Sequence, residues 1–270
     1  MQNPYWHDKA CLVTGASAGL GRALAAALAA GGARLAIVAR RSDPLQRLAE
    51  QLHEQTGSEV AAIPGDMAWP EDVERMQETV AARFGCLDLL INCVGRSSRR
   101  RVLETSPEDF QQLWDANFIS AVRCTQACSS WLLASGGHVV NIGSLASRFG
   151  SAYLGAYPAA KHALAAYTQQ LRMEHAAEGL HAMLVLPGPI AGSYQDRYAE
   201  QAADLPPSAR GPGGGAKLKG LDPDRLAADI LAAAVRRRPE LVAPAKARLL
   251  MIAAQCSPRL GDWLLGRYTR

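Results

Sequence analysis

The sequence predicts an α/β domain built on a single doubly wound parallel sheet with helices on both faces. Short apolar runs alternate with longer segments of helical periodicity, and the apolar runs are continuous. A glycine-rich turn joins the first run to a helix. Alternating strands and helices are the pattern of βαβ units, and continuous apolar runs are typical of strands buried on both faces.

The expected strands are seven short runs rich in Val, Ile, Leu and Ala. They cover residues 10–14, 34–39, 60–63, 87–91, 139–142, 182–186 and 241–243. Helical patterns extend from the glycine turn to Gly31 and then cover residues 45–55, 70–84, 107–117, 119–134 and 154–177. We therefore expect one domain over residues 1–243, which is within the size of a single domain, and an extension over residues 244–270.

Composition excludes several other classes of protein. No apolar segment reaches the ~20 residues needed to cross a bilayer, and residues 1–9 lack the apolar stretch of a signal peptide. The net charge of +4 is too small to indicate nucleic-acid binding, so the arginine runs 99–101 and 236–238 are expected to be solvated. The six cysteines lack metal-site spacing, which favours a reduced compartment. We expect a cytoplasmic protein that holds no metal.

Residues 14–21 directly follow the first strand and open a helix. Glycines permit a tight turn and a close approach of the backbone to a pyrophosphate, and the helix N-terminus offers free N–H groups. This context predicts a dinucleotide site. Its candidate residues are Gly15, Ser17, Gly19, Leu20 and Gly21.

The end of the second strand indicates which dinucleotide binds. Folds that prefer NAD usually carry an acidic residue there, but this sequence has Arg40 and Arg41 and no acid before Asp43. Guanidinium groups attract a 2′-phosphate, which favours NADP(H) as the cofactor. The alternative is that both arginines face solvent.

Further cofactor contacts are expected where the third, fourth and sixth strands end. The candidates are Asp66, Met67, Asn92, Gly95, Pro187, Gly188 and Ile190. Asp66 is placed to accept a hydrogen bond from the adenine amino group. The side chain of Asn92 and the backbone at Gly95 would line the ribose.

Tyr157 and Lys161 are four residues apart in a helical pattern, so their side chains share one face. A phenol with an ordinary pKa of about 10 is a poor acid near neutrality, and a nearby ammonium brings that pKa toward the working range. Ser144, at the end of the fifth strand, offers a hydroxyl to hold a carbonyl oxygen. His162 points about 100° away from Lys161 on a helix, which predicts a structural role.

Together these motifs resemble the short-chain dehydrogenase/reductase family over residues 8–190. The matching positions are Thr14-Gly-x-x-x-Gly19-x-Gly21, Asp66, Asn92-x-x-Gly95, Asn117, Ser144, Tyr157-x-x-x-Lys161 and Pro187-Gly188. The resemblance implies a Rossmann-type fold and hydride transfer between NADP(H) and a carbonyl or alcohol carbon, with Tyr157 as general acid in reduction. It also implies that Lys161 lowers the pKa of this tyrosine and binds the nicotinamide ribose. Ser144 would orient the substrate oxygen, and Asn117 would hold a water of the proton relay.

The sequence departs from the family pattern at two places. Cys93 and Val94 stand in the middle of the usual Asn-Asn-Ala-Gly motif. Gly192 stands where the family often has a threonine that binds the carboxamide, so Ser193 is the candidate substitute. The resemblance further implies a homodimer or homotetramer formed through the helices of residues 107–134 and 154–177.

The substrate side is expected after Ser144, after Pro187 and in the Pro/Gly-rich segment 205–220, which is either a flexible active-site loop or a plain connector. Its aromatic and apolar candidates are Phe149, Tyr153, Leu154, Tyr194 and Tyr198. They favour a small-molecule substrate that is a hydrophobic, lipid- or steroid-like ketone. The basic residues at 96–101 leave an acidic substrate group as an alternative.

The extension of residues 244–270 interleaves basic and apolar residues, a pattern found in helices that lie on membrane surfaces. Packing on a partner subunit and covering of the active site are the alternatives.

Two other functional classes fit the sequence less well than an oxidoreductase does. A non-catalytic NADP(H)-binding regulator would lack Tyr157 or Lys161, and an epimerase or dehydratase would need a larger C-terminal domain.

Overall fold

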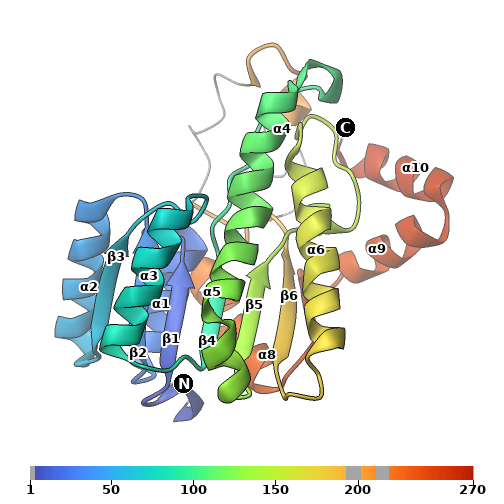
Figure 1. Ribbon diagram of the computed structural model, residues 1–270. Coiled ribbons are helices and arrows are strands. Elements are labelled where there is room, and N and C mark those ends of the chain that lie inside the picture. The colour runs from blue at the N-terminus through green and yellow to red at the C-terminus, as the bar shows by residue number, and fades with distance from the viewer. Residues whose placement is uncertain (1–3, 193–201, 211–218, 270) are drawn as a thin grey trace.

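A computed structural model of the chain describes residues 4–192, 202–210 and 219–269 (Figure 1). Within these residues, seven parallel strands form one sheet in the order β3-β2-β1-β4-β5-β6-β7. The strands are β1 Ala10–Thr14, β2 Arg34–Ala39, β3 Val60–Pro64, β4 Leu89–Asn92, β5 His138–Ile142, β6 His181–Pro187 and β7 Glu240–Ala243. The order runs outward in both directions from β1 and β4, so the carboxyl ends of these strands border a crevice.

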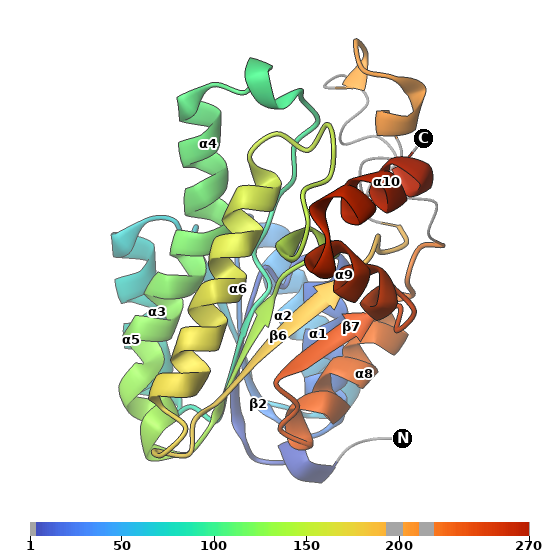
Figure 2. The same ribbon diagram turned by 90° about the vertical axis from the view of Figure 1, so that its right-hand side faces the viewer.

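Helices cover both faces of this sheet (Figures 1 and 2). One face carries α1 Gly19–Ala30, α2 Ser42–Thr56 and α8 Pro223–Val235; the other carries α3 Pro70–Arg83, α5 Ser120–Ala134 and α6 Tyr157–Glu174. Helix α4, Pro107–Trp114, leads into α5 through a π-helical turn, Asp115–Ile119. The predicted doubly wound fold is confirmed.

Successive strand residues face opposite helical layers, which explains the continuous apolar runs. In β1, Val13 packs in the cluster that includes Leu24 of α1, whereas Leu12 packs in the cluster that includes Met76 of α3. All four side chains are fully buried. A polar side chain at either position would be buried between the sheet and one of the helical layers, where the loss of hydration costs free energy.

One helix was not predicted, and another begins later than predicted. The prediction omitted α8, although Asp222 caps it by accepting hydrogen bonds from the N–H groups of Asp224 and Arg225 at 2.8 and 3.2 Å. Helix α6 begins at Tyr157 and not at residue 154, because Tyr153 and Gly155 have φ values of 64° and 52° that no helix contains. Pro158 therefore lies in the first helical turn, where its missing N–H costs no hydrogen bond.

Part of the predicted substrate loop is described. Residues 211–218 lie outside the described residues. Before them, the 3-10 turn η6, Pro207–Arg210, contributes Ala209 to a buried cluster with Ala202 and Leu205, and Tyr153 packs against this cluster. The extension after β7 folds as two helices, α9 Ala247–Cys256 and α10 Pro258–Thr269.

Two histidines are buried side by side at the amino ends of β5 and β6. His138 and His181 are partners in the strand register, and their Nδ1 atoms are 2.9 Å apart. The Nε2 of His181 faces the carbonyl oxygen of Arg238 at 2.8 Å and so must carry a hydrogen. In the neutral state its Nδ1 then accepts from His138, whose Nε2 accepts from the Tyr5 hydroxyl at 2.8 Å. Burial lowers the pKa of His181 and lowers that of His138 to about 3.

We expect the free energy of unfolding to fall as the pH is lowered from about 6.5 to about 3. Over this interval the unfolded chain binds a proton at His138 that the folded chain does not. The contribution is therefore complete above the unfolded pKa and is lost below it, by up to about 1.4 kcal/mol per pH unit. Urea unfolding at pH 7.5 and pH 5 measures the loss. His138→Gln should reduce it and exposed His162→Gln should not; equal losses in both variants would contradict the assignment.

Candidate active site

A cavity of about 1400 Å³ opens at the carboxyl edge of the sheet. Its walls come from the segments after β1, β4, β5 and β6, from the start of α6 and from the two C-terminal helices. Ligand sites typically occupy about 300–1,000 Å³, so this cavity has room for a dinucleotide together with a substrate.

The glycine turn after β1 lies against the cavity and is the expected phosphate-binding segment. Gly15 has a φ of 71°, and a Cβ there would lie 2.8 Å from the carbonyl oxygen of Cys93. A Cβ on Gly21 would lie 2.2 Å from the carbonyl oxygen of Gly15. Ala18, at the N-cap of α1, makes no side-chain capping hydrogen bond, and the uncapped N-terminus of a helix is suited to bind an anion. All five turn residues predicted to bind the cofactor line the cavity: Gly15, Ser17, Gly19, Leu20 and Gly21.

The end of the cavity that is expected to hold the adenine contains Arg40, Asp66 and Met67. The Arg40 guanidinium is largely exposed and lies 3.9 Å from a carboxylate oxygen of Asp66. Arg41 is exposed at the start of α2 and is not among the residues that line the cavity. The contact of Arg41 with a 2′-phosphate therefore stays a prediction. Trp69, which the sequence analysis did not single out, also lines this end and is 59% exposed.

Asn92 and Gly95 have different surroundings at the end of β4. Gly95 lines the cavity, and a Cβ there would lie 3.3 Å from the Lys161 Nζ. The Asn92 side chain is buried away from the cavity, where its amide donates to Thr125 Oγ1 at 3.2 Å and to Asn141 Oδ1 at 2.8 Å. This corrects the expectation that the Asn92 side chain lines the ribose.

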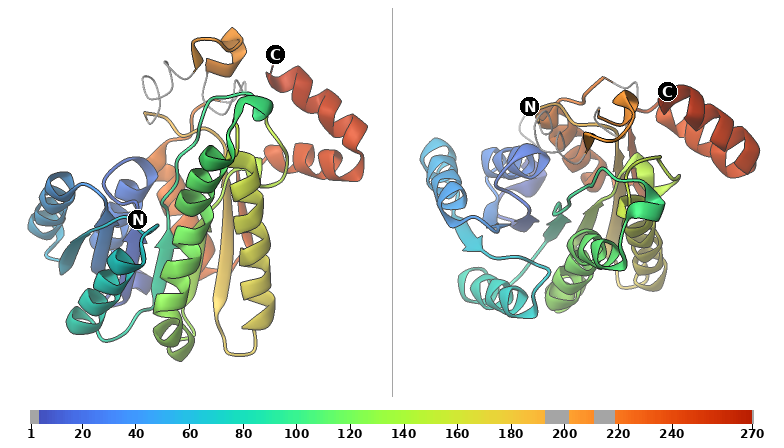
Figure 3. Two further views of the ribbon diagram at one scale, coloured as in Figure 1. Left: turned by 45° about the horizontal axis from the view of Figure 1, so that its top comes forward. Right: turned by 90° about the horizontal axis from the view of Figure 1, so that it is seen from above.

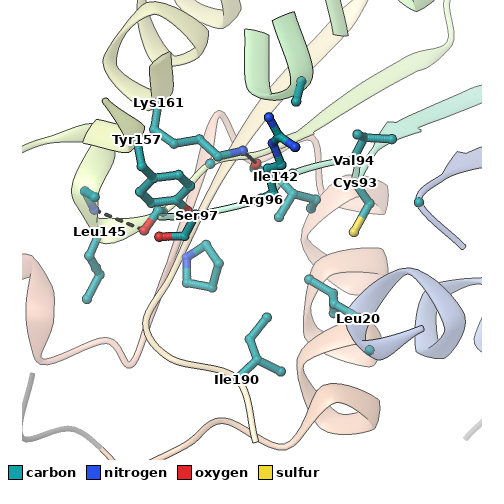
Figure 4. Close-up of a pocket in the computed structure, with 18 of the residues that line it drawn as sticks. Leu20, Cys93, Val94, Arg96, Ser97, Ile142, Leu145, Tyr157, Lys161 and Ile190 are labelled. Atoms are coloured by element: carbon teal, nitrogen blue, oxygen red, sulfur yellow. Dashed lines mark hydrogen bonds between the residues drawn. The ribbon is translucent and has the colours of Figure 1, made fainter. Parts of the chain in front are cut away.

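Ser144, Tyr157 and Lys161 line one cavity, as Figure 4 shows for the tyrosine and the lysine. Ser144 caps a short 3-10 turn, η4 Leu145–Ser147, and its hydroxyl oxygen accepts from the Ala146 N–H at 3.1 Å. The hydroxyl hydrogen is the donor that a substrate oxygen would need. Tyr157 begins α6 and Lys161 follows one turn later, so the sequence spacing places both on the same wall.

The Lys161 ammonium is buried beside the tyrosine. Its Nζ donates to the Ile142 carbonyl oxygen at 2.8 Å and lies 5.9 Å from the centre of the Tyr157 ring. Burial lowers the pKa of Lys161 to about 8, so the group still carries its charge near neutrality. Burial also raises the pKa of the Cys93 thiol to about 12, which keeps that thiol neutral. Lys161 is therefore placed to stabilise negative charge on Tyr157.

Asn117 lies behind the cavity wall, in the π-helical turn between α4 and α5. Its Oδ1 accepts from the Arg96 N–H at 3.2 Å, and its amide donates to the carbonyl oxygens of Arg96 and Leu113 at 2.9 Å each. The side chain thus holds the segment after β4 in place. Such π-helical turns occur frequently at functional sites.

The part of the cavity that is expected to hold the substrate contains Phe149 and Leu154, whereas Tyr153 packs against a buried cluster of residues 202, 205 and 209. Ile190, which was expected to contact the cofactor, also lines the cavity. Tyr194, Tyr198 and Ser193 lie outside the described residues, and Gly192 lines the cavity. Pro187 and Gly188 line it as predicted from the end of β6.

Four polar or charged lining residues were not among the predicted catalytic and cofactor contacts, although residues 96–101 were noted as a place for an acidic substrate group. These are Ser97, Arg96, Arg99 and Lys246. Arg99 was expected to be solvated; it is instead 3% exposed, because its Nε donates to the Ala209 carbonyl oxygen at 3.1 Å. Their participation depends on how loops distant in the sequence meet, which periodicity does not reveal.

Comparisons with known proteins agree with this geometry. The profile of the family described as short chain dehydrogenase matches residues 9–203. The chain belongs to the short-chain dehydrogenase/reductase family of oxidoreductases.

Two relatives illustrate the sequence similarity. An uncharacterised oxidoreductase, YxnA of Bacillus subtilis, is 29% identical over 262 residues, covering 96% of this chain and 71% of its own. Dehydrogenase/reductase SDR family member 7B of Danio rerio is 30% identical over 247 residues, covering 89% of this chain and 79% of its own.

Two solved structures share the fold. L-sorbose reductase from Gluconobacter frateurii, complexed with NADPH and L-sorbose, is 25% identical with a TM-score of 0.77, covering 87% of this chain and 95% of its own. An alcohol dehydrogenase from the archaeon Thermococcus sibiricus, complexed with 5-hydroxy-NADP, is 27% identical with a TM-score of 0.74, covering 87% and 96%.

Proposed function

We propose that the protein is an NADP(H)-dependent oxidoreductase that reduces a hydrophobic, lipid- or steroid-like ketone to an alcohol. The observation that carries this proposal is the convergence of Ser144, Tyr157 and Lys161 on a cavity that also contains the glycine turn. The same convergence disfavours a non-catalytic NADP(H)-binding regulator, which would have no need of the tyrosine and lysine.

The three side chains would have different roles at the substrate oxygen. When bound, NADPH supplies a hydride to the carbonyl carbon. The Ser144 hydroxyl would hydrogen-bond to the carbonyl oxygen, and the Tyr157 hydroxyl would give this oxygen its proton as the alcohol forms. The Lys161 ammonium would stabilise the resulting phenolate and hold the cofactor ribose. Asn117 would position the segment after β4 through its bonds to Arg96, and a water held at this residue would return the proton.

Two observations support NADP(H) over NAD(H). Arg40 lines the adenine end of the cavity with an exposed guanidinium that can pair with a 2′-phosphate. Both solved relatives described above contain an NADP-type dinucleotide.

The substrate class is supported by the lining of the cavity. Phe149 and Leu154 from the domain face the same space as Leu250 and Leu264 from the C-terminal helices. Arg96 and Lys246 in the same lining keep an acidic group on the substrate as the alternative. We further propose a homodimer or homotetramer built through α5 and α6, and a peripheral contact of the C-terminal helices with a membrane in a cytoplasmic setting.

The test is NADPH consumption by purified protein against ketones of increasing apolar chain length, with NADH in parallel. We expect turnover with NADPH that improves with chain length. Turnover with NADH alone would overturn the cofactor assignment. Preference for a short polar ketone would overturn the substrate class. Tight NADPH binding without turnover of any ketone would favour the regulator.

A further inference from the structure

The positive charge of this protein is concentrated in its C-terminal extension. Residues 244–270 contain five basic residues and one acidic residue, Asp262. The whole net charge of +4 therefore belongs to these 27 residues, and the remaining 243 carry equal numbers of basic and acidic residues. A neutral domain thus carries one cationic appendage.

This appendage is a hairpin of α9 and α10 that projects from the β7 edge of the domain (Figures 2 and 3). Helix α9 is anchored through buried Ala247 and Met251, which pack in a cluster with Leu145 and Val242. Helix α10 packs closely on α9, since a Cβ on Gly261 would lie 3.0 Å from the Ala254 Cα. No helix in residues 4–192, 202–210 or 219–269 is long and apolar enough to cross a membrane.

The outer surface of the hairpin combines apolar and cationic side chains. Leu249 and Ile252 of α9 are 75% and 52% exposed, and Leu260 and Trp263 of α10 are 43% and 58% exposed. Each pair is three residues apart and so shares one helical face. The exposed cations on the same helices are Arg248, Arg259 and Arg267. The Arg267 guanidinium lies 5.6 Å from the centre of the Trp263 ring.

The inner surface of the same hairpin is a wall of the candidate active site. Leu250 and Ala253 of α9 and Leu264 and Leu265 of α10 line the cavity. Leu249 belongs to both surfaces, because it lines the cavity and is 75% exposed. Apolar side chains of the hairpin therefore occur both on its exposed surface and in the lining of the cavity that contains Tyr157.

We propose that the α9–α10 hairpin docks on an anionic bilayer and passes the hydrophobic ketone from the bilayer into the cavity. The docking develops the peripheral membrane contact proposed above, and the passage rests on the proposed ketone reduction. Exposed leucine, isoleucine and tryptophan with flanking arginines are the side chains that bury in the headgroup boundary and attract anionic lipids. A second copy of this chain is the alternative occupant, and the oligomeric state of the variant distinguishes it.

Docking is tested by flotation of the full-length protein with vesicles of phosphatidylcholine alone or mixed with phosphatidylserine. We expect flotation with the mixed vesicles and its loss in added salt. Arg248→Glu/Arg259→Glu should abolish it. Arg47→Glu/Arg236→Glu, an equal change of charge at exposed positions on other helices, should not. Failure of the wild-type protein to float, or a change of oligomeric state without a change of flotation in the first variant, would overturn the proposal.

Passage is tested by NADPH oxidation with a long-chain ketone dissolved in the mixed vesicles and a short soluble ketone in buffer. Arg248→Glu/Arg259→Glu should lower turnover of the vesicle-borne ketone about tenfold or more and leave the soluble ketone unchanged, which also shows that the variant is folded. Equal turnover of the vesicle-borne ketone by variant and wild type would overturn passage. Flotation without turnover of either ketone by the wild type would overturn the proposed function and leave docking standing.

Discussion

Replacement of Tyr157 by phenylalanine should lower kcat for NADPH-dependent ketone reduction by roughly 10²–10⁴-fold, the usual contribution of a positioned general acid. The substitution removes only the hydroxyl, and the ring remains in the first turn of α6 beside Lys161. NADPH affinity should therefore change little. Steady-state turnover and a separate NADPH titration by fluorescence measure the two effects.

Tyr153→Phe is the matched control for this experiment. Tyr153 lies four residues earlier but packs against residues 202–209 and does not line the cavity. Its replacement should leave kcat within a few-fold of the wild type. Near-normal turnover by Tyr157→Phe, or an equal loss of kcat in both variants, would contradict the role of Tyr157 as general acid.

Replacement of Arg40 by glutamine should weaken NADPH binding by roughly 10–100-fold and leave NADH binding nearly unchanged. Hydrogen bonds to charged groups contribute about 1.5–3 kcal/mol, and only NADPH carries the 2′-phosphate that the guanidinium would meet. The exposed side chain of Arg40 is free to turn toward that phosphate, because its separation of 3.9 Å from Asp66 is too long for a hydrogen bond. Titration with each cofactor measures the change.

The Arg41→Gln variant distinguishes the contributions of Arg40 and Arg41 to NADPH binding. Because Arg41 does not line the cavity, its loss should weaken NADPH binding far less than the loss of Arg40. Equal effects of the two substitutions would mean that the 2′-phosphate lies between them. If the Arg40→Gln variant still preferred NADPH, residues other than Arg40 would determine the cofactor preference.

Local patterns in the sequence were sufficient to predict the strands of the sheet, the glycine turn, and the shared helical face of Tyr157 and Lys161. Strand residues buried on both faces must all be apolar, so the strands appear in the sequence as unbroken runs. A Cβ at Gly21 would collide with the backbone of its own turn, so the glycine is required by contacts only six residues apart. Two side chains four residues apart on a helix share a face whatever packs around them.

Only the tertiary structure decided which residues at the ends of these elements face the cavity. The Asn92 side chain is buried away from the cavity because Thr125 and Asn141, far away in the sequence, bind its amide, and Arg41 is exposed at the start of α2. The C-terminal helices line the active site because Ala247 and Met251 fit a core built from β6, β7 and the segment after β5. These placements depend on contacts between residues that are far apart in the sequence. A periodic pattern shows which face of a helix or strand is apolar, but it does not show which other element packs against that face.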